Sequence, residues 1–102
     1  MIVSKKITFD AAHFLPGYQG KCSSMHGHRW EVELAVEGEL NKSTGMVVDF
    51  VTLSQFLKIV ESKFDHHLVN DFIPMPTAEN IATYIKDLYL EMYGAVANYW
   101  LL

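Results

Sequence analysis

The sequence predicts a single α+β domain, with an antiparallel sheet from the first part of the chain and two helices from the second. Before residue 38, hydrophobic and polar residues alternate, which is typical of strands with one buried face. After residue 50, hydrophobic residues recur three and four positions apart, which is typical of amphipathic helices. The 102 residues have the length of one domain, spanning residues 1–102.

The two alternating segments are predicted to be strands over residues 6–14 and 26–37. One face of the first carries Ile7, Phe9, Ala11 and His13. One face of the second carries His26, His28, Trp30, Val32, Leu34 and Val36. Residues two apart in a strand point the same way, so both histidines of the second strand lie on its apolar face. If the strands pair as an antiparallel hairpin, three imidazoles converge at the edge of one apolar surface.

Turn-forming residues separate these segments. Pro16, Gly17 and Gly20 interrupt the alternation and place Cys22 on a loop between the strands. Residues 38–45, rich in Asn, Ser and Gly, are predicted to form a turn, and residues 46–50 a short third strand.

The helices carry their own start and stop signals. Thr52, with Gln55 three residues later, has the pattern of a capping box, so the first helix is predicted to begin there and to end near Phe64. Thr77 is predicted to cap a second helix that Gly94 closes. Residues 95–102 resemble the beginning of a last strand.

Composition limits the classes of partner. Half of the residues are hydrophobic and the mean hydropathy is +0.09, which indicates that other subunits cover apolar surface. A net charge of -4 without a Lys/Arg run excludes an electrostatic footprint for nucleic acid. The N-terminal residues lack the basic start and long apolar stretch typical of a signal peptide, and no apolar run approaches the roughly 18 residues that span a bilayer, so we expect a cytoplasmic protein without a membrane partner. A single cysteine excludes an intrachain disulfide.

The histidines indicate a metal centre. Zinc readily binds histidine nitrogen, and three histidines with an open fourth position are typical of catalytic rather than structural sites. The alternative is that His26 and His28 are ordinary strand histidines, because such pairs are common in strands. His13 on the same predicted face favours the metal, since three unpaired imidazoles would be costly to bury.

Three further residues are candidates for proton transfer, and each has a plainer explanation. Cys22 is either a buried small hydrophobe or a working thiol, whose place before the histidines favours the thiolate. Asp65 and His66 either form the polar end of a helix or act together, with the carboxylate orienting the imidazole. Catalysis requires that all three meet in space.

Five stretches, in order and with the expected gaps, resemble one known family. They are FDAAH at 9–13, CSSMHGH at 22–28, GMVVDF at 45–50, FDHHLVND at 64–71 and PTAEN at 76–80. From about Ile7 to the second helix, the chain resembles the 6-pyruvoyltetrahydropterin synthase family. The three-residue gap between Cys22 and His26 favours its bacterial branch, the 6-carboxy-5,6,7,8-tetrahydropterin synthases of queuosine biosynthesis. The cysteine also argues against relatives with a glutamate there.

The resemblance implies a tunnelling fold (T-fold), in which an antiparallel sheet with two helices on one face assembles into a barrel, commonly a homohexamer built as a dimer of trimers. It implies that His13, His26 and His28 bind Zn²⁺. It also implies that Cys22 is an acid/base thiol and that Asp65 and His66 complete the proton-handling set. Thr77 and Glu79 match a segment that holds the pterin in relatives, although a helix cap and a first-turn acid explain them equally well.

The implied reaction converts 7,8-dihydroneopterin triphosphate to 6-carboxy-5,6,7,8-tetrahydropterin, acetaldehyde and triphosphate. One alternative is triphosphate elimination to a 6-pyruvoyl product. Another is a truncated, non-catalytic zinc or pterin-binding module. It is kept because no residue matches the glutamate that anchors the pterin ring in the family, and because the C-terminal strand is expected to be incomplete.

Overall fold

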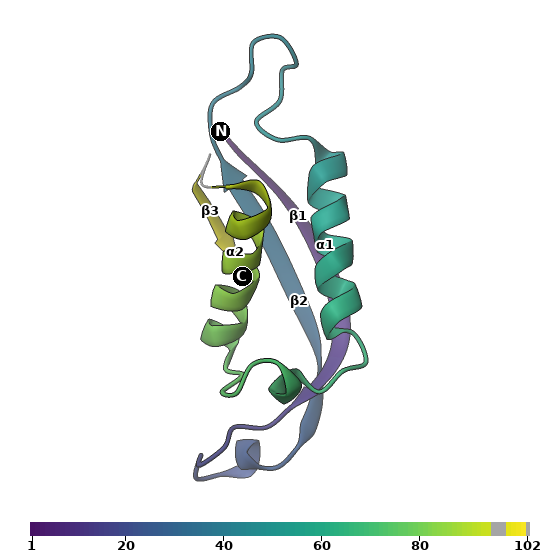
Figure 1. The fold of residues 1–102 in the computed structure, drawn as a ribbon, viewed down its shortest axis with the longest axis vertical. Helices are drawn as coiled ribbons and strands as arrows, with labels where there is room; N and C mark the ends of the chain where they lie inside the picture. Colours follow the sequence, from purple (N-terminus) through teal and green to yellow (C-terminus); the bar gives the residue numbers. More distant parts are fainter. Residues whose placement is uncertain (95–97, 102) are drawn as a thin grey trace.

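The fold is built on a long hairpin (Figure 1), seen here in a computed structural model that describes residues 1–94 and 98–101. Strands β1 (Ile2–His13) and β2 (His26–Glu37) pair antiparallel along their whole length, from Ile2 opposite Glu37 to His13 opposite His26. The first strand therefore starts four residues before the predicted position. A short strand, β3 (Asn98–Leu101), pairs with the end of β2, so the sheet has the order β1-β2-β3.

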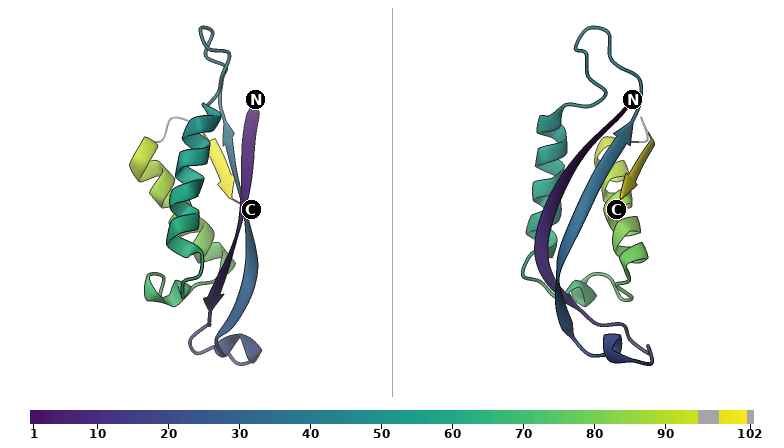
Figure 2. Two further views of the ribbon diagram at one scale, coloured as in Figure 1. Left: turned by 90° about the vertical axis from the view of Figure 1, so that its right-hand side faces the viewer. Right: turned by 180° about the vertical axis from the view of Figure 1, so that it is seen from behind.

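Two helices, α1 (Phe50–Phe64) and α2 (Ala78–Tyr93), cover the same face of this sheet (Figure 2). Two short 3-10 helices, η1 (Lys21–Ser23) and η2 (Val69–Asp71), lie in the loops. The core fills the layer between the helices and the sheet. Its largest members with almost no exposed surface are Phe56, Phe64, Leu34, Leu53, Leu57 and Ile85. The predicted α+β class and the helical face of the sheet are confirmed.

The alternation of β1 and β2 matches their burial. Phe9, Val32 and Leu34 are buried against the helices, as their shared face predicts. At the far end the hairpin extends past both helices (Figure 1). On β2 the same face is more open there, with Trp30 half-buried and His28 exposed, whereas His13 on β1 stays buried. None of the helices described in residues 1–94 is long and apolar enough to cross a bilayer.

The predicted short strand at residues 46–50 is wrong. The segment follows a turn in which the backbone N–H of Gly45 donates to the carbonyl of Asn41 at 2.7 Å. Gly45 has φ +71°, a left-handed conformation that favours glycine. Met46 and Phe50 are exposed, and Phe50 already belongs to α1. Alternating residues form a strand only beside a partner strand, and the described residues offer this segment none.

The predicted start of the first helix is also wrong, because Asp49 rather than Thr52 caps it. The Asp49 carboxylate accepts the N–H of Val51 at 2.8 Å, so α1 begins at Phe50. The second helix agrees with its prediction. Thr77 accepts the N–H of Asn80 at 3.1 Å, and Gly94 closes the helix with φ +76°.

The predicted last strand is confirmed over Asn98–Leu101. Residues 95–97 and 102, which the prediction also included, lie outside the described residues.

Candidate active site

The three predicted metal ligands converge at the end of the hairpin. His13 is the last residue of β1 and lies opposite His26, the first residue of β2, while His28 lies opposite Ala11. One ligand atom from each of the three histidines lies within 4.8 Å of the others. The ring centroids of His13 and His26 are 4.6 Å apart, and those of His26 and His28 are 4.7 Å apart. Strand pairing alone therefore brings three imidazoles together.

Two of these imidazoles are oriented by backbone carbonyls. Nδ1 of His13 lies 2.8 Å from the carbonyl oxygen of Pro76, and Nδ1 of His26 lies 2.7 Å from that of Ser24. A carbonyl only accepts, so each Nδ1 carries the proton and donates. In the neutral ring each Nε2 then keeps its lone pair. This is the tautomer of a metal-binding histidine whose other nitrogen is held by the protein.

The environment of His13 favours its neutral form. Its side chain is buried, and burial lowers its pKa below the ordinary value of 6.5. The Pro76 carbonyl opposes this shift, while His26 and His28 add to it. A neutral imidazole is the form that binds a metal. His26 is half-buried and His28 is exposed, so the cluster opens toward solvent on the His28 side.

Cys22 lies in η1, on the loop that joins the two strands next to the histidine cluster. Its thiol is free and half-buried. Its carbonyl accepts the N–H of Leu15 at 2.7 Å, which ties the two sides of the loop together. The loop that carries the thiol thus begins after His13 and ends before His26, two of the candidate ligands.

Asp65 and His66 form a dyad at the end of α1. Nδ1 of His66 lies 2.9 Å from Oδ2 of Asp65, and the other carboxylate oxygen accepts the backbone N–H of Asp10 at 3.0 Å. The Asp10 N–H and then His66 hold the pKa of the Asp65 carboxyl below 3.8. His66 has φ +58°, an uncommon conformation for a residue other than glycine. Its N–H donates to the carbonyl of Asp10 at 2.7 Å, which holds it there.

An open groove of about 530 Å³ lies between the hairpin and the loop that follows α1. His28 and His66 both line it, and so do Asp10, Ala11, Ala12, Gly27, Arg29, His67 and Leu68. The described lining residues do not include Cys22. His66 and one metal-ligand candidate, His28, therefore line the same groove within one chain, while the thiol is not among the described lining residues.

Sequence reasoning did not select Asp10 and Arg29 as site residues. They lie opposite each other across β1 and β2, and Arg29 donates twice to the Asp10 carboxylate, at 3.0 and 3.1 Å. This ion pair lowers the pKa of Asp10 and raises that of Arg29. The available signal is the hairpin register itself, which places opposite charges in one cross-strand pair once His13 and His26 are aligned.

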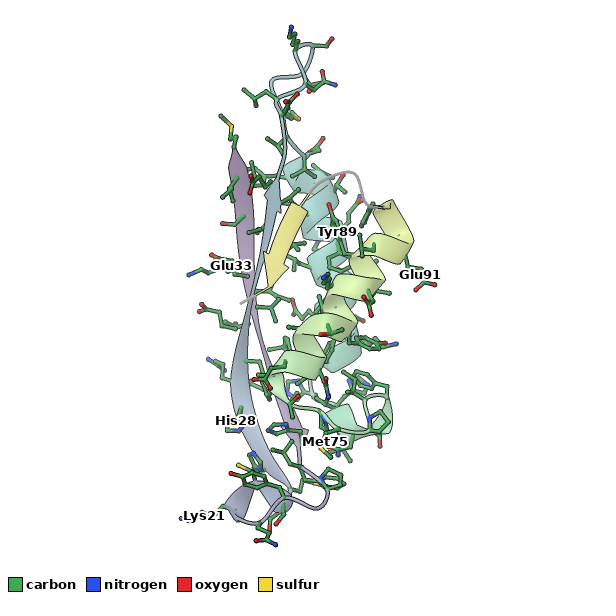
Figure 3. All side chains as sticks on the ribbon, turned by 90° about the vertical axis from the view of Figure 1, so that its left-hand side faces the viewer. Lys21, His28, Glu33, Met75, Tyr89 and Glu91 are labelled. Carbon is green, nitrogen blue, oxygen red and sulfur yellow. The ribbon has the colours of Figure 1, made fainter. Side chains whose placement is uncertain are left out.

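Thr77 and Glu79 lie at the start of α2. The Thr77 hydroxyl caps the helix, and the exposed Glu79 is in the first turn, so the plainer explanations of both residues hold. The preceding residue, Pro76, binds His13 through its carbonyl, which places this segment beside the cluster. Met75 lies at the same level along the hairpin as His28 (Figure 3).

Comparison with known proteins agrees with this arrangement. The family described as 6-pyruvoyl tetrahydropterin synthase matches residues 2–96. The chain belongs to that family. A 6-carboxy-5,6,7,8-tetrahydropterin synthase of Synechocystis is 38% identical to this member of the 6-pyruvoyl tetrahydropterin synthase family over 91 residues, covering 82% of the chain and 70% of the relative. A dihydroneopterin monophosphate aldolase of Pyrococcus furiosus is 37% identical over 82 residues, covering 80% of the chain and 68% of the relative.

A solved structure supports the fold of this family member. The 6-pyruvoyl tetrahydropterin synthase of Caenorhabditis elegans superposes with a TM-score of 0.84, covering 100% of this chain and 94% of that one. Its sequence is 22% identical, so the likeness concerns the fold alone. Together with the family match, it confirms the predicted resemblance and the T-fold.

Proposed function

We propose that this chain is a zinc-dependent lyase that converts 7,8-dihydroneopterin triphosphate and water to 6-carboxy-5,6,7,8-tetrahydropterin, acetaldehyde and triphosphate. The observation that carries the proposal is the convergence of His13, His26 and His28, with one ligand atom from each within 4.8 Å of the others. The groove supports it further, because His28 and His66 are both among its lining residues. The identity to pterin synthases such as that of Synechocystis supports the substrate class.

The residues present fit a zinc ion. All three donors are imidazole nitrogens, and two of the rings are already held by backbone carbonyls in the tautomer that leaves Nε2 free. His13, His26 and His28 would hold the ion and leave a coordination position for substrate oxygen. When bound there, zinc supplies a Lewis acid that makes a hydroxyl oxygen of the pterin side chain more acidic.

The proton transfers belong to the chain's own groups. The Asp65 carboxylate binds Nδ1 of His66, which orients the ring and leaves Nε2 available to the groove. We propose that His66 and the Cys22 thiol exchange protons with substrate carbon and oxygen during triphosphate loss and carbon–carbon cleavage. Thr77 and Glu79 are proposed to contact the pterin, because Pro76 joins their segment to His13.

We further propose that the chain works as a homo-oligomer, a dimer of trimers, in the cytoplasm. Exposed apolar side chains support self-association, among them Ile2, Met25, Leu40, Phe50 and Val51. Sedimentation of the full chain tests this assembly, and a monomer at micromolar concentration would contradict it.

The decisive experiment identifies products. The zinc-analysed protein is incubated with 7,8-dihydroneopterin triphosphate, and the proposal expects acetaldehyde and 6-carboxy-5,6,7,8-tetrahydropterin in equal amounts. A 6-pyruvoyl product without acetaldehyde would instead indicate the pyruvoyl-forming reaction. Bound zinc without any turnover would indicate a non-catalytic binding module. Cys22→Ala is expected to lose turnover while keeping zinc, and Ser23→Ala, in the same loop, is the matched control.

A second candidate activity follows from the Pyrococcus furiosus relative, whose name is dihydroneopterin monophosphate aldolase. The same assay is therefore run with dihydroneopterin monophosphate. Faster consumption of the monophosphate than of the triphosphate would favour the aldolase. The place in queuosine biosynthesis is tested separately, by restoring queuosine in the tRNA of a bacterium that lacks its own 6-carboxytetrahydropterin synthase.

A further inference from the structure

The three candidate zinc ligands differ in how they are held. His13 and His26 each donate from Nδ1 to a backbone carbonyl, at 2.8 and 2.7 Å. The ring of His28 has no hydrogen-bond partner within residues 1–94, and it is also the exposed member of the cluster. A metal-bound histidine normally has a partner on its other nitrogen that fixes the ring. Something else must therefore orient His28.

Trp30 is the side chain in position to do so. It lies two residues after His28 on the same face of β2, and its ring meets that of His28 edge to face, with centroids 5.4 Å apart at 86°. It meets His13 in the same way, with centroids 4.9 Å apart at 84°. Such edge-to-face geometry is favourable for aromatic pairs.

The indole is itself held in place. Its Nε1–H donates to the carbonyl of Ala11 at 3.3 Å, and Ala11 is the residue directly opposite His28. Phe9, which is buried in the core, lies opposite Trp30. The half-buried indole therefore joins the apolar core to the histidine cluster, and its ring borders the space that the His28 ring occupies.

We infer that Trp30 is a positioning residue for the metal centre, because its indole holds His28 in the ligating orientation in place of a hydrogen bond. This inference rests on the zinc site of the proposed function. Without the indole, the exposed His28 ring samples other rotamers and loses that freedom only when the ion binds. The affinity for zinc falls accordingly, while His13 and His26 keep their carbonyl partners.

The test measures zinc affinity of the full chain by competition with a chromophoric chelator. Trp30→Ala is expected to weaken zinc binding about tenfold or more, the range of losing an outer-shell contact. If Trp30→Ala does not fold, Trp30→Leu takes its place with the same expectation. The control is Tyr93→Ala, which removes an aromatic ring packed on Phe56 and Tyr89 at the end of α2 away from Pro76. It is expected to lower thermal stability and leave zinc affinity unchanged.

A double-mutant cycle separates positioning of His28 from a general effect on packing. In a His28→Ala background, the substitution of Trp30 is expected to change zinc affinity less than twofold, because the residue it positions is gone. Independent losses that multiply would overturn the inference, and so would a Trp30 variant that binds zinc as tightly as the wild type. Failure of the wild type to bind zinc would instead refute the zinc site of the proposed function.

Discussion

The carboxylate of Asp65 accepts a hydrogen bond from the backbone N–H of Asp10, with 3.0 Å between Oδ1 and N. The Asp10 carbonyl in turn accepts the N–H of His66 at 2.7 Å. The dyad is thus attached to the edge of β1 that does not pair with β2, and the carboxylate stands where a backbone carbonyl of another strand would stand. Because β1 ends at His13, the same strand supports the dyad and the candidate metal centre.

Substitutions of Asp65 are expected to separate its attachment to β1 from its charge. Asp65→Asn keeps an oxygen that can accept the Asp10 N–H, whereas Asp65→Ala leaves that part-buried donor without its partner. We therefore expect Asp65→Ala to lower the free energy of unfolding more than Asp65→Asn, measured by urea denaturation. Equal losses would show that the hydrogen bond to Asp10 does not contribute to stability.

Acid stability is expected to depend on the same carboxylate. The pKa of Asp65 in the folded protein lies below its ordinary 3.8, because the Asp10 N–H and His66 stabilise the charged form. The resulting stabilisation is fully present above the unfolded-state value and is lost as the pH falls through the folded-state value. Between pH 4 and pH 2, wild-type stability should therefore fall more steeply than that of Asp65→Asn. Asp87→Asn, on the exposed side of α2, should follow the wild-type slope.

The histidine cluster could be predicted from the sequence because it depends on two regularities of β-structure. Alternation places His13, His26 and His28 on the apolar face, and a hairpin brings the ends of its strands together. Both regularities follow from backbone geometry and need no knowledge of the distant parts of the chain. The Pro76 carbonyl that orients His13 lies 63 residues away in sequence, and no local pattern indicates that contact.

Local patterns failed where two residues offered the same signal. Asp49 and Thr52 are both good N-caps, and Gln55 made Thr52 the more complete pattern. The choice depends on where the chain leaves the turn at Gly45, which is a tertiary matter. The groove was not predicted for a similar reason. Arg29 of β2 and His66 of the loop after α1 both line it because β1 lies between their two segments. Strand register and loop path therefore had to come from the structure.

Two substitutions test whether Asp49 or Thr52 caps α1. Asp49→Ala removes the acceptor for the Val51 N–H and is expected to cost about 1 kcal/mol of stability, within the usual range for an N-cap. Thr52→Ala lies inside the helix and is expected to change stability by less than about 0.5 kcal/mol, since alanine is the better helix former there. Urea denaturation of both variants compares them. A larger loss for Thr52→Ala would favour the helix start that the sequence predicts.

Removal of one candidate ligand is expected to lower zinc affinity more than substitution of a neighbouring residue. His13→Ala, His26→Ala and His28→Ala should each weaken zinc binding by more than the roughly 10- to 100-fold that loss of an outer-shell partner costs. His67→Ala is the matched control, because this exposed histidine lines the groove but lies outside the cluster. Chelator competition measures all four. Zinc affinity that falls as much in His67→Ala as in His13→Ala would remove the case for a three-histidine site.

The segment at the start of α2 allows a structural role to be separated from substrate binding. Thr77→Ala loses the cap on the Asn80 N–H and should cost about 1 kcal/mol, while Thr77→Ser keeps the hydroxyl and should cost little. Glu79 is exposed and makes no cap, so Glu79→Gln should lose only its interaction with the helix dipole, about 0.3 to 1 kcal/mol. If Glu79 contacts the pterin, Glu79→Gln raises KM well beyond that of Thr77→Ser. An unchanged KM in Glu79→Gln would show that Glu79 does not contact the pterin and acts only as an acidic residue in the first turn of α2.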